Sequence, residues 1–227
     1  MERAALFDVD GTLTDTNHLH IVAWWEALRQ ADHVVPMQAV HRALGRPSSD
    51  LLEELLGKER DREQDGELTA AHSALYGQYF DRLAAFPGAG DLLRELAADG
   101  WRIVLVTSAG GSELKALRRA IDADDAIFAT ASADDVSEGK PAPEPVEHAL
   151  RLAEVAAAQA VFIGDSVWDM KAAVRAGVRA VAVLSGGIPR ADLEAAGARE
   201  VFDDPADLLS HLKSGSLALG LDRPARS

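Results

Sequence analysis

The chain of 227 residues contains no cysteine, so it can form neither a disulfide nor a thiolate metal site or nucleophile. Basic side chains are also scarce: 23 Lys and Arg stand against 37 Asp and Glu, a net charge of −14. This balance argues against nucleic acids and anionic membrane surfaces as partners. No stretch approaches the ~20 apolar residues of a membrane span, and the N-terminus shows no secretory signal. We therefore expect a cytoplasmic protein without a nucleic-acid or membrane partner.

Apolar residues make up 48% of the chain, which is enough to build a large core. Short apolar runs alternate with amphipathic segments, as in a parallel sheet that is covered by helices. The predicted strands are 4–7, 103–106, 127–129, 160–163 and 179–184, with a short sixth at 201–202. Segments 111–120, 145–154 and 168–176 have the length of crossover helices, so a doubly wound α/β sheet is the simplest topology.

The interval 16–86 breaks this alternation, because it shows helical patterns and no convincing strand. Its first predicted helix spans 17–30, and a Pro-Gly pair at 87–88 marks the return to the sheet. The sequence therefore predicts a sheet domain with a helical insertion. The predicted parts are a sheet domain at 1–15 and 87–212, a helical domain at 16–86, and a fraying tail at 213–227.

Two carboxylates, Asp8 and Asp10, stand two residues apart directly after the apolar run 4–7. Residues i and i+2 of a strand point the same way, so both would leave the sheet on one side while Val9 turns into the core. Gly11 then allows the chain to turn sharply. Like charges this close are tolerable only if a cation lies between them or one keeps a proton. The pattern indicates an enzyme site, although Asp-x-Asp-Gly is also typical of a plain turn.

Three further polar groups follow predicted strands. They are the hydroxyls and amides of Thr107, Ser108 and Ala109, the ammonium group of Lys140, and the carboxylates of Asp165 and Asp169. In open α/β sheets the ligand crevice lies beyond the carboxyl ends of the strands, so all these groups should converge. Each group taken singly also has a purely structural explanation. The hydroxyls could cap a helix, the lysine could be an ordinary exposed surface residue, and the two carboxylates could belong to a turn and a helix cap. However, the chain has only five lysines, and hydroxyls with free amides at a Gly-rich helix start bind anions.

In this order, Asp-x-Asp-Gly-Thr, Thr-Ser, Lys-Pro and Gly-Asp-x-x-x-Asp resemble the four motifs of the haloacid dehalogenase superfamily, over about 4–212. The helical insertion resembles that family's type-one cap. Asp15-Thr16 with His20 and Trp24 resembles its branch of phosphoglycolate phosphatases and β-phosphoglucomutases. The resemblance implies a Rossmann-like core with a cap domain, Mg²⁺ as cofactor, and a small phosphorylated metabolite as substrate.

The resemblance also implies a role for each motif residue. Asp8 is the expected nucleophile, which forms an aspartyl-phosphate, and Asp10 the acid and base, which must hold a proton near neutral pH. The expected Mg²⁺ ligands are Asp8, the backbone carbonyl of Asp10 and Asp165, with Asp169 binding through water or orienting the others.

Other residues are expected to hold the substrate. The expected phosphate-binding groups are Thr107, Ser108, Ala109 and Lys140. From the cap, His20 and Arg46 are candidate substrate contacts, since a guanidinium binds phosphate or carboxylate bidentately. A buried histidine and an ordinary surface arginine are the alternatives for these two, and Trp24 is expected to pack within the cap.

Several other activities fit the sequence less well. A dehalogenase needs no proton donor for an alcohol, so Asp10 points to phosphate esters. Phosphonate cleavage and sugar-phosphate mutases in this family use a cap lysine, whereas Lys58, in a charged connector, is the only lysine of 16–86. Hydrolysis is therefore favoured, with a mutase as the alternative. A phosphorelay receiver would be smaller and uninterrupted. The expected assembly is a monomer or a weak homodimer.

Overall fold

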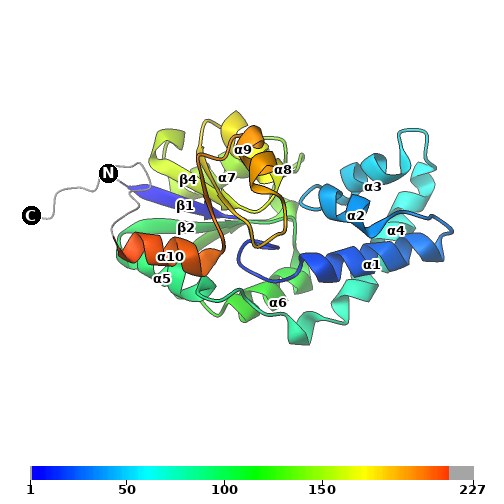
Figure 1. Ribbon diagram of the computed structural model, residues 1–227, viewed down its shortest axis with the longest axis horizontal. Coiled ribbons are helices and arrows are strands. Elements are labelled where there is room, and N and C mark those ends of the chain that lie inside the picture. The colour runs from blue at the N-terminus through cyan, green and yellow to red at the C-terminus, as the bar shows by residue number, and fades with distance from the viewer. Residues whose placement is uncertain (1, 215–227) are drawn as a thin grey trace, which may run out of the picture.

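A six-stranded parallel β-sheet forms the centre of the computed structural model, which describes residues 2–214 (Figure 1). The strands are β1 (Arg3–Phe7), β2 (Trp101–Val106), β3 (Ile127–Ala131), β4 (Ala160–Gly164), β5 (Arg179–Val183) and β6 (Glu200–Phe202). They lie in the order β3-β2-β1-β4-β5-β6, and all neighbours run parallel. The predicted strands are confirmed to within two residues at each end, and so is the doubly wound topology.

Helices cover both faces of the sheet (Figure 1). On one face lie α5 (Ala89–Ala98), α6 (Gly111–Ile121) and α10 (Pro205–Lys213), and on the other α7 (Glu144–Ala153), α8 (Val167–Arg175) and α9 (Arg190–Ala196). Alternate residues of β1 serve the two cores: Ala5 and Phe7 pack with the first group, and Ala4 and Leu6 with the second. The strands are therefore continuous apolar runs, because both faces of the sheet are buried.

Four helices follow β1 as an insert that lies beside the sheet layers (Figure 1). They are α1 (Asn17–Gln30), α2 (Met37–Ala43), α3 (Ser48–Leu56) and α4 (Asp65–Gly77). Short 3-10 helices lie at Arg62–Gln64 and Phe80–Arg82 in the insert, and at Ala133–Asp135 and Ala157–Gln159 in the sheet domain. The insert has its own apolar core, made by Ile21, Trp24, Leu28, Val40, Ala43, Leu51, Leu52 and Leu68. Residues 16–86 contain no β-strand, as predicted.

The C-terminal helix α10 reaches Lys213, the first residue of the predicted tail. Residues 215–227 lie outside the described residues, so the expected fraying stays a prediction there. Within residues 2–214, no helix is long and apolar enough to cross a membrane.

The loop after β1 turns sharply and leads into the insert. The carbonyl of Val9 accepts hydrogen bonds from the amides of residues 12–14, which closes a tight turn. Gly11 has φ +80°, which residues with a side chain rarely adopt, and a Cβ there would collide with the Asn17 side chain. The turn therefore holds both motif aspartates at the carboxyl end of β1, where the insert begins.

Candidate active site

A cavity of about 410 Å³ is lined by side chains from both the carboxyl edge of the sheet and the insert. Nine of the ten predicted site residues line it: Asp8, Asp10, His20, Arg46, Thr107, Ser108, Lys140, Asp165 and Asp169. The crevice expected beyond the strand ends is therefore present, and Asp8 and Asp169, which are 161 positions apart, meet in it.

The loop after β2 presents two hydroxyl groups to this cavity. Thr107 and Ser108 line it, and neither caps α6, because the N-cap is Gly110 and makes no side-chain cap bond. The tenth predicted residue, Ala109, does not line it. Its N–H donates to the Thr107 Oγ1 at 3.0 Å, so this amide is already engaged within the loop.

Three buried carboxylates form the floor of the site: Asp8, Asp165 and Asp169. One oxygen of each lies within 4.8 Å of the others. The Thr12 hydroxyl is 3.2 Å from Asp8 Oδ2 and 3.0 Å from Asp165 Oδ1, and its single hydrogen serves only one of them at a time. Burial raises the pKa of Asp8 to about 7, with Lys140 opposing the rise and Asp169 adding to it. Burial also raises the pKa of Asp165, and Asp8 and Asp169 add to that rise.

Lys140 supplies the positive charge among these carboxylates. Its Nζ pairs with Asp8 and lies 2.8 Å from Asp169 Oδ1. Burial opposes its charge, but the two carboxylates outweigh burial and raise the pKa of Lys140. The other Asp169 oxygen accepts hydrogen bonds from the Ser166 N–H at 3.0 Å and Oγ at 2.6 Å, a capping box at the start of α8. Asp169 therefore completes the capping box whose N-cap is Ser166, and it also pairs with the lysine.

Asp10 faces the insert. Its Oδ1 accepts a hydrogen bond from the Thr16 hydroxyl at 2.6 Å and lies 3.3 Å from His20 Nε2. Burial opposes the charge on Asp10, but the bonds from His20 and Thr16 outweigh it and lower the pKa of Asp10. Burial likewise opposes the charge on His20, and the contact with Asp10 raises the pKa of that imidazole. The contact therefore favours the charged forms of both side chains, the carboxylate of Asp10 and the imidazolium of His20, which comes from the insert.

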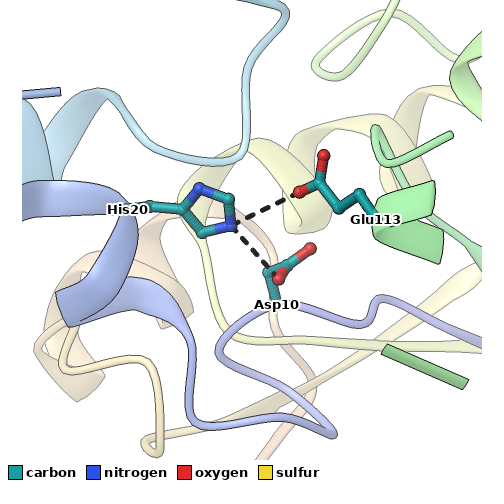
Figure 2. Close-up of side chains that lie close together, drawn as sticks. All are labelled: Asp10, His20 and Glu113. Carbon is teal, nitrogen blue, oxygen red and sulfur yellow. Dashed lines mark hydrogen bonds and ion pairs between the residues drawn. The ribbon is translucent and has the colours of Figure 1, made fainter. Parts of the chain in front are cut away.

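Sequence reasoning missed two other neighbours of His20. Glu113, in the first turn of α6, places Oε1 3.7 Å from His20 Nε2 (Figure 2). His72, in α4, lies 3.1 Å from His20 Nδ1, and its ring stacks on Trp24 with centroids 4.2 Å apart. Burial and His20 lower the pKa of His72 to about 3, so it is neutral. Acidic residues are common in a helix's first turn, so Glu113 gave no distinctive signal.

Asn17, the first residue of α1, was also missed. Its buried amide donates to Asp165 Oδ2 at 2.9 Å and to the Gly186 carbonyl at 3.3 Å. The first turn of the insert is therefore tied directly to a site carboxylate.

Arg46 connects the insert to the first turn of α8. Its guanidinium lies 3.9 Å from the ring centroid of Trp168, and Nη1 lies 3.2 Å from Glu54 Oε2. The Trp168 indole N–H in turn donates to the Arg42 carbonyl at 3.3 Å. Arg46 is thus a contact between insert and sheet domain rather than an ordinary surface arginine, and its contact with substrate stays a prediction.

Comparison with known proteins finds consistent similarity. A family model described as haloacid dehalogenase-like hydrolase matches residues 2–177. A phosphoglycolate phosphatase from Rhodospirillum rubrum is 33% identical over 221 residues, which cover 92% of this chain and 90% of the relative. The crystal structure of a hydrolase from Pseudomonas syringae has TM-score 0.88 and 34% identity, covering 94% of this chain and 99% of that one. A β-phosphoglucomutase structure from Clostridium difficile, at 19% identity, has TM-score 0.81 and covers 94% and 96%.

Proposed function

The chain belongs to the haloacid dehalogenase-like hydrolases, and on that premise we propose that it is a magnesium-dependent phosphatase acting through an aspartyl-phosphate. The observation that carries this proposal is the buried contact of Asp8 with Lys140 beside two further carboxylates. The similarity to a phosphoglycolate phosphatase supports a small phosphate monoester as substrate.

The donor set fits a magnesium ion. Asp8, Asp165 and Asp169 offer oxygens within 4.8 Å of one another, and Mg²⁺ prefers hard oxygen ligands. We assign Asp8, Asp165 and the Asp10 backbone carbonyl as ligands. Asp169, whose oxygens already meet Ser166 and Lys140, takes the orienting role. Bound Mg²⁺ neutralises the repulsion between carboxylates and phosphate and polarises the phosphoryl group.

The first half-reaction transfers the phosphoryl group to the protein. An Asp8 oxygen attacks phosphorus and forms a new P–O bond, while the bond to the leaving alcohol breaks. Asp10 delivers a proton to the departing oxygen, and His20 replaces that proton through their hydrogen bond. Lys140, beside Asp8, and the Thr107 hydroxyl hold the phosphoryl oxygens where charge develops.

The second half-reaction releases phosphate. Asp10 takes a proton from water, the water oxygen attacks phosphorus, and the bond to Asp8 breaks. The proton passes back to His20, so the pair returns to its starting state. We assign residues 16–86 the role of a cap that excludes bulk water during both steps and chooses the leaving alcohol.

Hydrolysis is favoured over phosphoryl transfer between positions of a sugar. The family's mutases use a cap lysine, whereas Lys58 does not line the cavity. The stretch from 70 to 80 instead places His72, a neutral side chain, against His20.

The proposal predicts a metal-dependent release of phosphate. Chelated, metal-free protein should be inactive towards a panel of phosphorylated metabolites, and Mg²⁺ should restore release of inorganic phosphate. With glucose 1-phosphate, we expect glucose and phosphate as products, separated by chromatography. Turnover without a divalent cation would contradict the metal assignment, and accumulation of glucose 6-phosphate would make the chain a mutase.

Asn17→Ala is expected to weaken Mg²⁺ binding by about 10–100-fold, because Asp165 loses the amide that orients its carboxylate. Calorimetric titration of Mg²⁺ into metal-free protein measures this. Gln30→Ala, at the exposed far end of the same helix, serves as control and should leave the affinity unchanged. An unchanged Mg²⁺ affinity in Asn17→Ala would show that this amide does not support the metal site.

A further inference from the structure

Glu113 is a carboxylate in the cavity wall that the proposed reaction does not use. It lines the same cavity as Asp8 and Asp10. One of its oxygens lies within 4.8 Å of an Asp10 oxygen, and Figure 2 shows the two carboxyl groups converging on the same ring nitrogen of His20. Glu113 therefore lies beside the proposed proton donor, in the wall of the same cavity.

Glu113 keeps an acceptor open towards the cavity. Within residues 2–214 its one ion pair is with His20, at 3.7 Å, and it makes no hydrogen bond. Its side chain is 28% exposed, so it is accessible from the cavity. A carboxylate oxygen without a protein partner is a ready acceptor for a hydrogen bond from a substrate.

The surroundings of Glu113 disfavour a further negative charge. Burial raises the pKa of Glu113 to about 7, with His20 opposing the rise and Asp10 adding to it. The Arg46 guanidinium, also in the cavity wall, pairs with Glu54 through Nη1 alone, and its buried Nε has no hydrogen-bond partner among the described residues. Among the described lining residues Lys140 is the one lysine, and it is committed to the carboxylates of the floor.

We propose that Glu113 is a specificity-determining residue that selects phosphate esters with a hydroxyl group on the carbon next to the ester carbon. It selects against esters with a carboxylate there. This inference rests on the proposed function, in which Asp10 reaches the ester oxygen. The substituent one carbon further on then faces Glu113. A hydroxyl donates to the open carboxylate oxygen, whereas a carboxylate meets a like charge. The chain would thus differ in substrate from its phosphoglycolate phosphatase relative.

The test compares glycerol 3-phosphate, which carries the hydroxyl, with phosphoglycolate, which carries the carboxylate. For wild type at pH 8, we expect kcat/KM to favour glycerol 3-phosphate by about tenfold or more. Glu113→Gln should shrink this ratio by about tenfold, chiefly through KM. Glu147→Gln makes the same change in the exposed first turn of α7 and should leave the ratio unchanged. If an ester turns over too slowly for its KM to be measured, it is added as a competitor of p-nitrophenyl phosphate hydrolysis. Its inhibition constant is then compared in place of its KM.

Three results would overturn the inference: a wild-type preference for phosphoglycolate, an unchanged ratio in Glu113→Gln, or selective loss of phosphoglycolate hydrolysis in Arg46→Gln. The last would show that Arg46 recognises a carboxylate. Hydrolysis of p-nitrophenyl phosphate by the wild type separates the two proposals. If that ester is not hydrolysed either, the proposed function fails; if it is, an unchanged ratio removes only the specificity of Glu113.

Discussion

Asp8→Asn is expected to lower kcat by about 10⁴-fold or more while leaving the fold intact. The asparagine amide cannot attack phosphorus. Among the described residues, Asp169 is the other carboxylate that pairs with Lys140, but its hydrogen bond from Ser166 holds it in place, so it does not substitute for Asp8. Release of phosphate from p-nitrophenyl phosphate measures the loss.

The fold should survive because charge on Asp8 does not stabilise the metal-free protein above neutral pH. Burial raises the pKa of Asp8 to about 7, above its ordinary value, so its ionisation on raising the pH costs folding free energy. An asparagine never carries that charge. At pH 8 we therefore expect the melting temperature of metal-free Asp8→Asn not to fall.

Asp91→Asn provides the matched control for Asp8→Asn, because Asp91 lies exposed in the first turn of α5. It should retain wild-type kcat. Near-normal hydrolysis by Asp8→Asn would mean that another group attacks phosphorus.

Asp10→Asn is expected to lower turnover by about 10²–10⁴-fold and to accumulate phosphorylated protein. An amide cannot relay the proton of His20 to the leaving oxygen, nor take one from water in the second step. With a leaving group that needs no proton, such as p-nitrophenolate, the first step suffers less than the second. Acid-quenched samples, analysed by intact-protein mass spectrometry, measure the accumulated phosphoenzyme.

A normal rate for Asp10→Asn, with no phosphorylated protein, would remove Asp10 from the acid and base role. Slow turnover without accumulation of phosphorylated protein would place its contribution in the first step alone.

The sheet and the floor of the site were predictable because both depend on short stretches of consecutive residues. Strands buried on both faces read as apolar runs, and the polar groups directly after them must meet at the carboxyl edge. Asp8 and Asp165 follow this rule, Lys140 lies further along the connection after β3, and the structure brings all three into one cavity. The hydrogen bonds within the loops could not be predicted in the same way. The Ala109 amide donates to the Thr107 hydroxyl, and this contact depends on the conformation of the turn.

The contacts between insert and sheet could not be predicted, because they join residues that no period or spacing relates. Asn17 reaches Asp165 across 148 positions, and Arg46 reaches Trp168 across the same interface. The contact of His20 with Asp10, which lowers the pKa of Asp10 and raises that of His20, has the same origin. A strand pattern shows that two carboxylates lie close together, but not which imidazole approaches one of them from another layer.

The phosphorylated residue itself tests the central claim most directly. Asp10→Asn protein is mixed with Mg²⁺ and p-nitrophenyl phosphate, quenched in acid, digested, and mapped by mass spectrometry. We expect one phosphoryl group on the peptide that contains Asp8, and none on that peptide in the Asp8→Asn, Asp10→Asn double variant. A phosphoryl group on His20 or another side chain, or phosphate release with no phosphorylated peptide, would contradict the account.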